Sequence, residues 1–127
     1  MSFAFDPTEG LIVLPVRISG PNGGTAVNLA LDTGATGSVV SWETIVFLGY
    51  DPAVAEKRVQ ITTGSGVEFV PKMEVRELEA LGQVRRHFPV LCHTLPPSAT
   101  VDGVLGLDFF RGQRLAIDFR AGLVIVD

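Results

Sequence analysis

The sequence predicts an all-β protein with one or two short helices, and three observations support this class. The apolar residues are mostly Val, Ile, Leu and Phe, of which the branched and aromatic members favour strands. The chain contains 14 glycines and 8 prolines, which supply many turns. About nine short apolar runs, each a candidate strand, alternate with these turns, as expected for a closed or folded-over β domain.

The composition indicates a single globular domain over residues 1–127. Hydrophobic residues make up 46% and charged residues 19%, which excludes intrinsic disorder. A chain of 127 residues can bury a core without a metal or a disulfide.

The first elements are two strands and a loop. Residues 11–19 and 25–31 predict a hairpin, in which Pro15 indicates an edge or a bend. Residues 32–37 (DTGATG) form a loop of small residues directly after the second strand, and residues 38–41 predict a short strand.

A short helix is expected over residues 42–49. Ser41 is a suitable N-cap, and Gly49 a suitable stop.

The middle of the chain predicts a second hairpin. Residues 58–62 and 67–78 form its strands around a tip at 63–66, and we expect an interruption near Pro71.

The last third of the chain adds four elements. Residues 84–95 predict a strand that ends at Pro96–Pro97, and 101–106 form a compact apolar segment. Residues 107–111 suit a helical turn, and 115–126 a closing hairpin.

The charge pattern argues against a nucleic-acid partner. There are 10 Lys and Arg against 14 Asp and Glu, a net charge of −4. Arg85-Arg86 and Lys57-Arg58 are isolated pairs, whereas phosphate binding needs a basic stripe.

A cytoplasmic location is expected, with no membrane partner. The single cysteine, Cys92, cannot form an internal disulfide, so a reducing compartment fits. The N-terminal segment shows no signal-peptide pattern. No apolar run approaches the ~20 residues that span a bilayer.

Asp32 is the strongest candidate for chemistry. It follows an apolar strand, so its carboxylate is expected to be partly desolvated. Thr33, Gly34 and Ala35 are small enough to let backbone N–H groups and a substrate approach it. The tripeptide by itself favours an ordinary turn, because Asp, Thr and Gly are common turn formers, and a functional role depends on the rest of the chain.

Two segments resemble the signatures of retropepsin-like aspartic proteases. Residues 29–35 (LALDTGA) are similar to the active-site signature of that family, in which apolar residues precede Asp-Thr-Gly-Ala. Val104, Leu105 and Gly106 resemble its second signature, which packs beneath the catalytic loop. The resemblance implies an acid-protease β-barrel with Asp32 as the catalytic residue.

The resemblance also implies a flap, a glycine-tipped hairpin that closes over the substrate. It covers roughly residues 11–126 and places the family's terminal strands at the closing hairpin. The flap tip has no aromatic residue, which suggests a permissive pocket. The residues implied for flap and substrate binding are Thr63, Gly64, Ser65 and Gly66.

The family's chemistry requires two carboxylates that share a water, and the chain has one Asp-Thr-Gly. The resemblance therefore implies a homodimer with Asp32 of each subunit at the twofold axis. Thr33 would brace the two loops, and the substrate would be an extended, largely apolar peptide segment. No metal or organic cofactor is needed.

Two positions depart from the retroviral pattern. Thr36 and Leu107 replace an acid and an arginine that pair in viral enzymes and support the dimer. The segment 38–50 is also longer, so the chain looks more like the bacterial and cellular members.

Other functions remain as alternatives. The same fold could serve as a non-catalytic dimerisation or peptide-binding module, or act only inside a larger complex. The loop also resembles a phosphate loop of actin-like ATPases, but those need a far longer chain. A dinucleotide site is excluded because no Gly-x-Gly-x-x-Gly is present.

The remaining candidate residues favour structural roles. His87, Cys92 and His93 match no standard zinc spacing, and Cys92 suits the core. Asp102 suits a turn, Asp108 a cap or a partner for nearby backbone, and Asp118 a hairpin surface. Trp42, Phe109 and Phe110 are expected to be core or interface anchors.

Overall fold

A computed structural model describes residues 1–96 and 98–127, with Thr63 described by its backbone alone, and it confirms the all-β class. Pro97, at the predicted end of a strand, lies outside the described residues. The strands are β1 (Ser2–Ala4), β2 (Val13–Gly20), β3 (Gly23–Leu31), β4 (Val39–Ser41), β5 (Lys57–Thr63), β6 (Gly66–Ala80), β7 (Gln83–His93), β8 (Gly103–Leu105), β9 (Leu115–Asp118) and β10 (Leu123–Val126). The helical elements are α1 (Trp42–Phe47) and two 3-10 turns, η1 (Pro52–Val54) and η2 (Leu107–Phe110).

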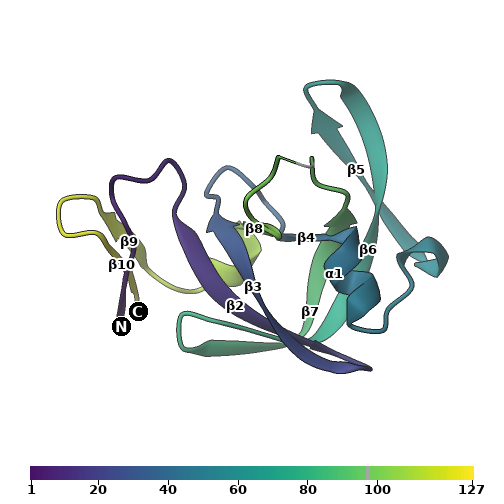
Figure 1. Cartoon of the computed structure of the whole chain (residues 1–127), viewed down its shortest axis with the longest axis horizontal. Coiled ribbons are helices and arrows are strands. Elements are labelled where there is room, and N and C mark those ends of the chain that lie inside the picture. The colour runs from purple at the N-terminus through teal and green to yellow at the C-terminus, as the bar shows by residue number, and fades with distance from the viewer. Residues whose placement is uncertain (97) are drawn as a thin grey trace.

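Six strands close into a barrel (Figure 1). The order in the main sheet is β2-β3-β8-β4-β7-β6-β5, and β2 pairs with β6 as well. That second pairing, between 17–19 and 77–79, closes the ring and leaves β5 outside it on β6. Closure removes most of the free sheet edge that an open sheet would expose.

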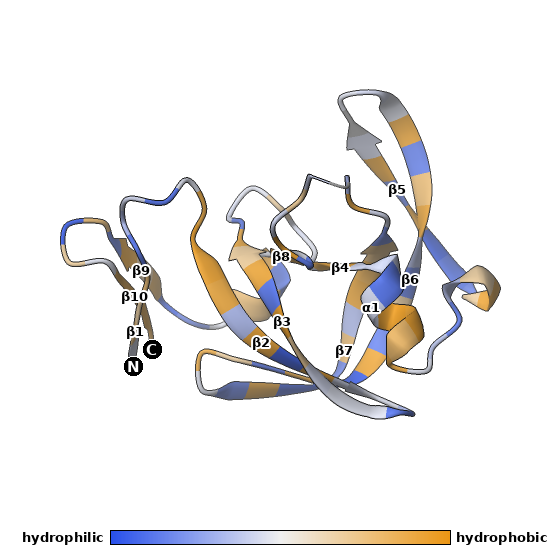
Figure 2. Cartoon of the chain, in the orientation of Figure 1, coloured by the Kyte–Doolittle hydropathy of each residue, from blue (hydrophilic) through white to orange (hydrophobic). Residues whose placement is uncertain are grey.

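The barrel interior is filled by alternate residues of its strands. On β2, Leu14, Val16 and Ile18 are buried while their neighbours face outward, which matches the banding along the strands in Figure 2. Phe109 from η2 is fully buried and makes edge-to-face contacts with Phe88 and Phe110. The η2 turn therefore anchors the segment after β8 in the core, as the sequence predicted.

The chain termini form a small separate sheet. Its order is β1-β10-β9, and β1 pairs with β10 from Ser2 opposite Ile125 to Ala4 opposite Leu123. The sequence predicts the β9–β10 hairpin but does not indicate β1. A three-residue run carries no readable alternation, and it becomes a strand only because β10 offers an edge.

The predicted interruption near Pro71 is wrong, because β6 continues through it from Gly66 to Ala80. Pro71 lies opposite Arg58 of β5, while the pairing of β6 with β7 ends at Lys72. One edge of β6 therefore needs no amide donor at Pro71, and the proline costs no ladder hydrogen bond. Pro15 of β2 is tolerated for the same reason: β6 pairs with β2 only from Arg17 onward, so the edge of β2 that faces β6 is unpaired at Pro15.

The α1 helix begins where the sequence predicts and ends at Phe47, two residues before the expected 49. The Ser41 hydroxyl accepts a hydrogen bond from the Thr44 amide at 3.2 Å, and Gly49 has a φ of +96° just beyond the helix. Among the described residues, none of the helices has the length and apolar character required to cross a membrane.

Several loops gather at one end of the barrel (Figure 1). The loop after β3, the β1–β2 connection and the β7–β8 connection all project from this end, and the tip of the β5–β6 hairpin extends beyond it. This end therefore has the backbone variety from which a site can be built.

We predict that Gly103→Ala destabilises the fold. A Cβ at Gly103 would lie 2.0 Å from the Val39 carbonyl oxygen, a backbone atom of the neighbouring strand that cannot move aside. We expect a loss of at least about 2 kcal/mol in the free energy of unfolding, measured by urea denaturation. Gly10→Ala is the matched control, because no atom lies within 4 Å of its Cβ; equal stability of the two variants would contradict the barrel register.

Candidate functional site

Asp32 lies directly after β3, at the loop-bearing end of the barrel. Its amide donates to the Leu105 carbonyl at 3.0 Å, which extends the parallel pairing of β3 with β8 by one residue. Its side chain is half-buried, and its Oδ1 accepts a hydrogen bond from the Gly34 amide at 2.9 Å. Thr33 and Gly34 are exposed. The carboxylate is therefore held at the surface by backbone and can be approached across small residues.

The turn interpretation of Asp-Thr-Gly is correct as local geometry. Asp6, Asp51 and Asp118 also accept a hydrogen bond from the amide two residues later, as Asp32 does. This turn is a common property of aspartate and does not mark a site. What distinguishes Asp32 is its position between barrel strands and the contacts of its loop.

The second apolar segment runs alongside the Asp32 loop. Val104 and Leu105 lie opposite Ala30 and Leu31 in the parallel β3–β8 ladder. A Cβ at Gly106 would lie 2.7 Å from the carbonyl oxygen of Ala35, so only glycine permits this approach. The two segments therefore pack backbone against backbone.

A buried hydroxyl fastens the far end of the loop. Ser38 is 1% exposed, and its Oγ donates to Asp108 Oδ1 at 2.7 Å while it accepts from the Gly106 amide at 2.9 Å. The Ser38 amide donates to Asp108 Oδ2 at 3.1 Å. The Leu107 amide also donates to the Ala35 carbonyl at 2.8 Å. We call Ser38, Gly106 and Asp108 the loop clasp.

The loop clasp confirms Asp108 as a partner for nearby backbone, but the sequence does not indicate the role of Ser38. Ser38 and Asp108 are 70 residues apart, and no local spacing relates them. The one available signal is a serine at the start of a short strand next to a loop of small residues, which is common in surface turns too.

The hairpin of β5 and β6 extends from the barrel as an arm of residues 57–71. Its register ends with Thr63 opposite Gly66, so Gly64 and Ser65 form a two-residue tip. Val70 is buried on the inner face, whereas Val67 and Phe69 are 56% and 66% exposed on the other. The predicted tip lacks an aromatic residue, yet Phe69 places one on the arm.

The other candidates have structural surroundings. Cys92 is buried, which confirms its place in the core, and this burial raises the pKa of its thiol to about 11. Among the described residues, no three His, Cys, Asp or Glu side chains converge on a common point. Asp102 accepts from the Asn28 amide at 3.0 Å, and Asp118 caps the β9–β10 turn. Phe109 and Phe110 are core residues, and Trp42 packs against the core.

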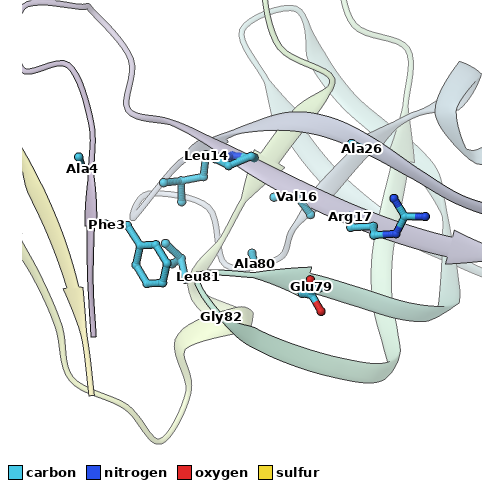
Figure 3. Close-up of a pocket in the computed structure, with 11 residues that line it drawn as sticks. Phe3, Ala4, Leu14, Val16, Arg17, Ala26, Glu79, Ala80, Leu81 and Gly82 are labelled. Carbon is cyan, nitrogen blue, oxygen red and sulfur yellow. The ribbon is translucent and has the colours of Figure 1, made fainter.

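A cavity of about 410 Å³ lies between the terminal sheet and the barrel (Figure 3). Phe3 and Leu81 face each other at one side of it, and Arg17 and Glu79 lie at the other. None of its lining residues belongs to the Asp32 loop or to the arm.

Comparison with protein families identifies the chain. A family model described as aspartyl protease matches residues 14–109, a span that includes Asp32, the arm and the loop clasp. The chain belongs to the aspartyl protease family. A search of curated protein sequences found no match.

Solved structures show the fold of this aspartyl protease family member. A retropepsin-like aspartic protease from Rickettsia conorii is similar with a TM-score of 0.74 at 16% identity, over 99% of this chain and 88% of that one. EIAV protease in complex with the inhibitor HBY-793 gives a TM-score of 0.59 at 23% identity, over 82% and 88%. The barrel is retropepsin-like, as the sequence resemblance implied.

We predict that Ser38→Ala loosens the Asp32 loop. The substitution leaves the Gly106 amide and one Asp108 oxygen without their buried partner, so we expect a loss of about 1–3 kcal/mol in the free energy of unfolding. Ser38→Thr keeps the hydroxyl and is expected to retain more stability. Thermal and urea unfolding measure the stability of both variants. A Ser38→Ala protein as stable as the wild type would show that the loop clasp does not stabilise the fold.

Proposed function

We propose that this protein is a homodimeric aspartic endopeptidase whose active site pairs Asp32 with Asp32 of a second copy. The observation that carries the proposal is the Asp32 loop itself. A half-buried carboxylate is fixed by the Gly34 amide and is flanked by exposed small residues, within a span that matches the aspartyl protease family.

The second carboxylate of the dyad would come from another copy. The chain has one Asp-Thr-Gly, and its loop lies at the rim of the barrel, where a twofold partner can approach. Thr33 is exposed beside Asp32, which leaves its hydroxyl able to reach the partner's loop. Leu107 and Thr36 supply no ion pair to such a dimer, so the proposed interface depends on other contacts.

The proposed chemistry follows from two carboxyls in close contact. Two negative charges at such a distance repel, so one proton is shared by the pair. The ionised member removes a proton from a bound water, which attacks the scissile carbonyl. The protonated member polarises that carbonyl and then protonates the departing amine. The nucleophile is water, and the residues given this role require no metal or organic cofactor.

The arm is proposed to act as the flap. Its tip at Gly64 and Ser65, with the flanking Thr63 and Gly66 backbone, could donate to and accept from an extended peptide. Val104, Leu105 and Gly106 are proposed to keep the Asp32 loop in place from below. An extended, largely apolar segment is the proposed substrate class.

We predict that Asp32→Asn abolishes peptide cleavage without unfolding the protein. Asparagine keeps the Oδ1 that accepts from the Gly34 amide but cannot exchange the catalytic proton, so the cleavage rate should fall by about 10²- to 10⁴-fold. Asp118→Asn is the matched control, because Asp118 makes the same turn far along the chain. Cleavage that survives Asp32→Asn contradicts the proposal, and binding of a peptide that stays uncut favours a non-catalytic module.

We predict a dimer in sedimentation equilibrium, at twice the monomer mass. Because the dyad needs two copies, specific activity should fall on dilution through the dissociation constant of the dimer. A protein that remains monomeric at high concentration but cleaves peptides would refute the shared site.

A further inference from the structure

The arm is connected to the barrel by a histidine whose two ring nitrogens both face acceptors. His93 Nε2 lies 2.9 Å from Glu68 Oε2 on the arm, and His93 Nδ1 lies 2.7 Å from the carbonyl oxygen of Thr94. A carbonyl oxygen only accepts, so Nδ1 must carry a proton. A neutral imidazole then has a bare Nε2, which would face the carboxylate with a lone pair.

Both contacts are satisfied together only by the imidazolium, which donates from each nitrogen. We propose that Glu68, His93 and the Thr94 carbonyl form a proton-operated latch of the flap. The protonated ring bridges the arm to the start of the β7–β8 connection, and the neutral ring must release one of its two partners. This inference rests on the proposed function for its effect on peptides, but not for the latch itself.

The latch holds the arm at a point beyond its pairing with β7. The register of β6 with β7 ends at Lys72 opposite Leu91, so the arm beyond this point is paired within itself. If that register continued for two more residues, Val70 would lie opposite His93. Glu68, two residues from Val70, would then be the diagonal neighbour of His93 on the same face of the sheet. The contact therefore joins the arm to β7 beyond the last β6–β7 pair, between that pair and the tip of the arm.

The side chains around His93 include one direct acidic partner and few cations. Glu68 on β6 is its direct partner, while Ser41 on β4, its neighbour in the ladder, does not titrate. Glu43 and Asp102 line the adjacent cavity together with Thr94, and both are acidic. Lys72 is the nearest cation along β6, four residues from Glu68 and opposite Leu91.

The sign of the pH dependence follows from the hydrogen bond. The Glu68 contact is the largest cause that raises the pKa of His93 above its usual value, and the Thr94 carbonyl raises it further against partial desolvation. The latch is therefore complete below the ordinary histidine pKa of about 6.5 and is lost as pH rises through the raised pKa of His93. The arm should open more often in neutral and alkaline solution than in mild acid.

The latch is expected to slow the opening of the arm by a small but measurable factor. The side chains of His93 and Glu68 are 29% and 52% exposed, so solvent screens the pair. Exposed ion pairs contribute little, and we expect loss of the latch to speed opening of the arm about two- to fivefold. That range suits a gate that must open in each catalytic cycle.

The test is an NMR titration of the full-length protein with Glu68→Gln, with Glu74→Gln as the control. Glu74 lies on the same strand and is exposed, and its replacement removes the same charge six residues away. We expect Glu68→Gln to lower the pH at which His93 titrates and to leave the titration of His87, the other histidine, unchanged. Glu74→Gln should change neither. An unchanged His93 titration in Glu68→Gln would overturn the latch.

The second readout is hydrogen exchange at the Val67 and Phe69 amides on the arm. We expect faster exchange in Glu68→Gln and His93→Gln than in wild type at pH 5.5, and a smaller difference near pH 8, after correction for intrinsic exchange. Equal exchange at pH 5.5 would show that the contact does not restrain the arm. Both measurements are independent of cleavage, so an inactive protein would contradict the proposed function and leave the latch to be judged by its own result.

Discussion

The structure depends on the backbone contact between the Asp32 loop and the end of β8 with the residues directly after it. Asp32 N to Leu105 O and Leu107 N to Ala35 O hold two points of the loop, and Gly106 permits the approach because it has no Cβ. Buried backbone groups must be paired, so these hydrogen bonds allow little freedom in where the carboxylate lies. The barrel and the core turn at Phe109 hold the two segments at this distance.

The loop clasp explains why the site needs polar residues in a largely apolar interior. Ser38 is fully buried and satisfies both its hydrogen-bonding roles, while Asp108 accepts from its amide and hydroxyl. A satisfied buried network specifies one arrangement, because any other leaves a group unpaired. The loop therefore obtains its rigidity from β8 and η2 rather than from its own sequence of small residues.

The arm has the opposite character. It leaves the barrel at Lys72, is paired within itself, and is held further out by the contacts of Glu68 with His93. Mobile elements are drawn from the parts of a fold with few buried contacts, and an arm that carries Val67 and Phe69 in solvent fits that description. The proposed function uses both characters, because it needs a carboxylate held in one position and an arm that can move.

The sequence by itself determined most of the strands, the three hairpins, the α1 helix after Ser41 and the small-residue loop at Asp32, because each depends on local periodicity or turn chemistry. It also indicated the retropepsin-like family through its ordered motifs. Only the tertiary structure decided that β6 continues through Pro71, that residues 2–4 form a strand, and that Ser38 meets Asp108. These features depend on partners far along the chain, whose position is fixed by closure of the barrel and by the register of its strands, and no local pattern encodes them.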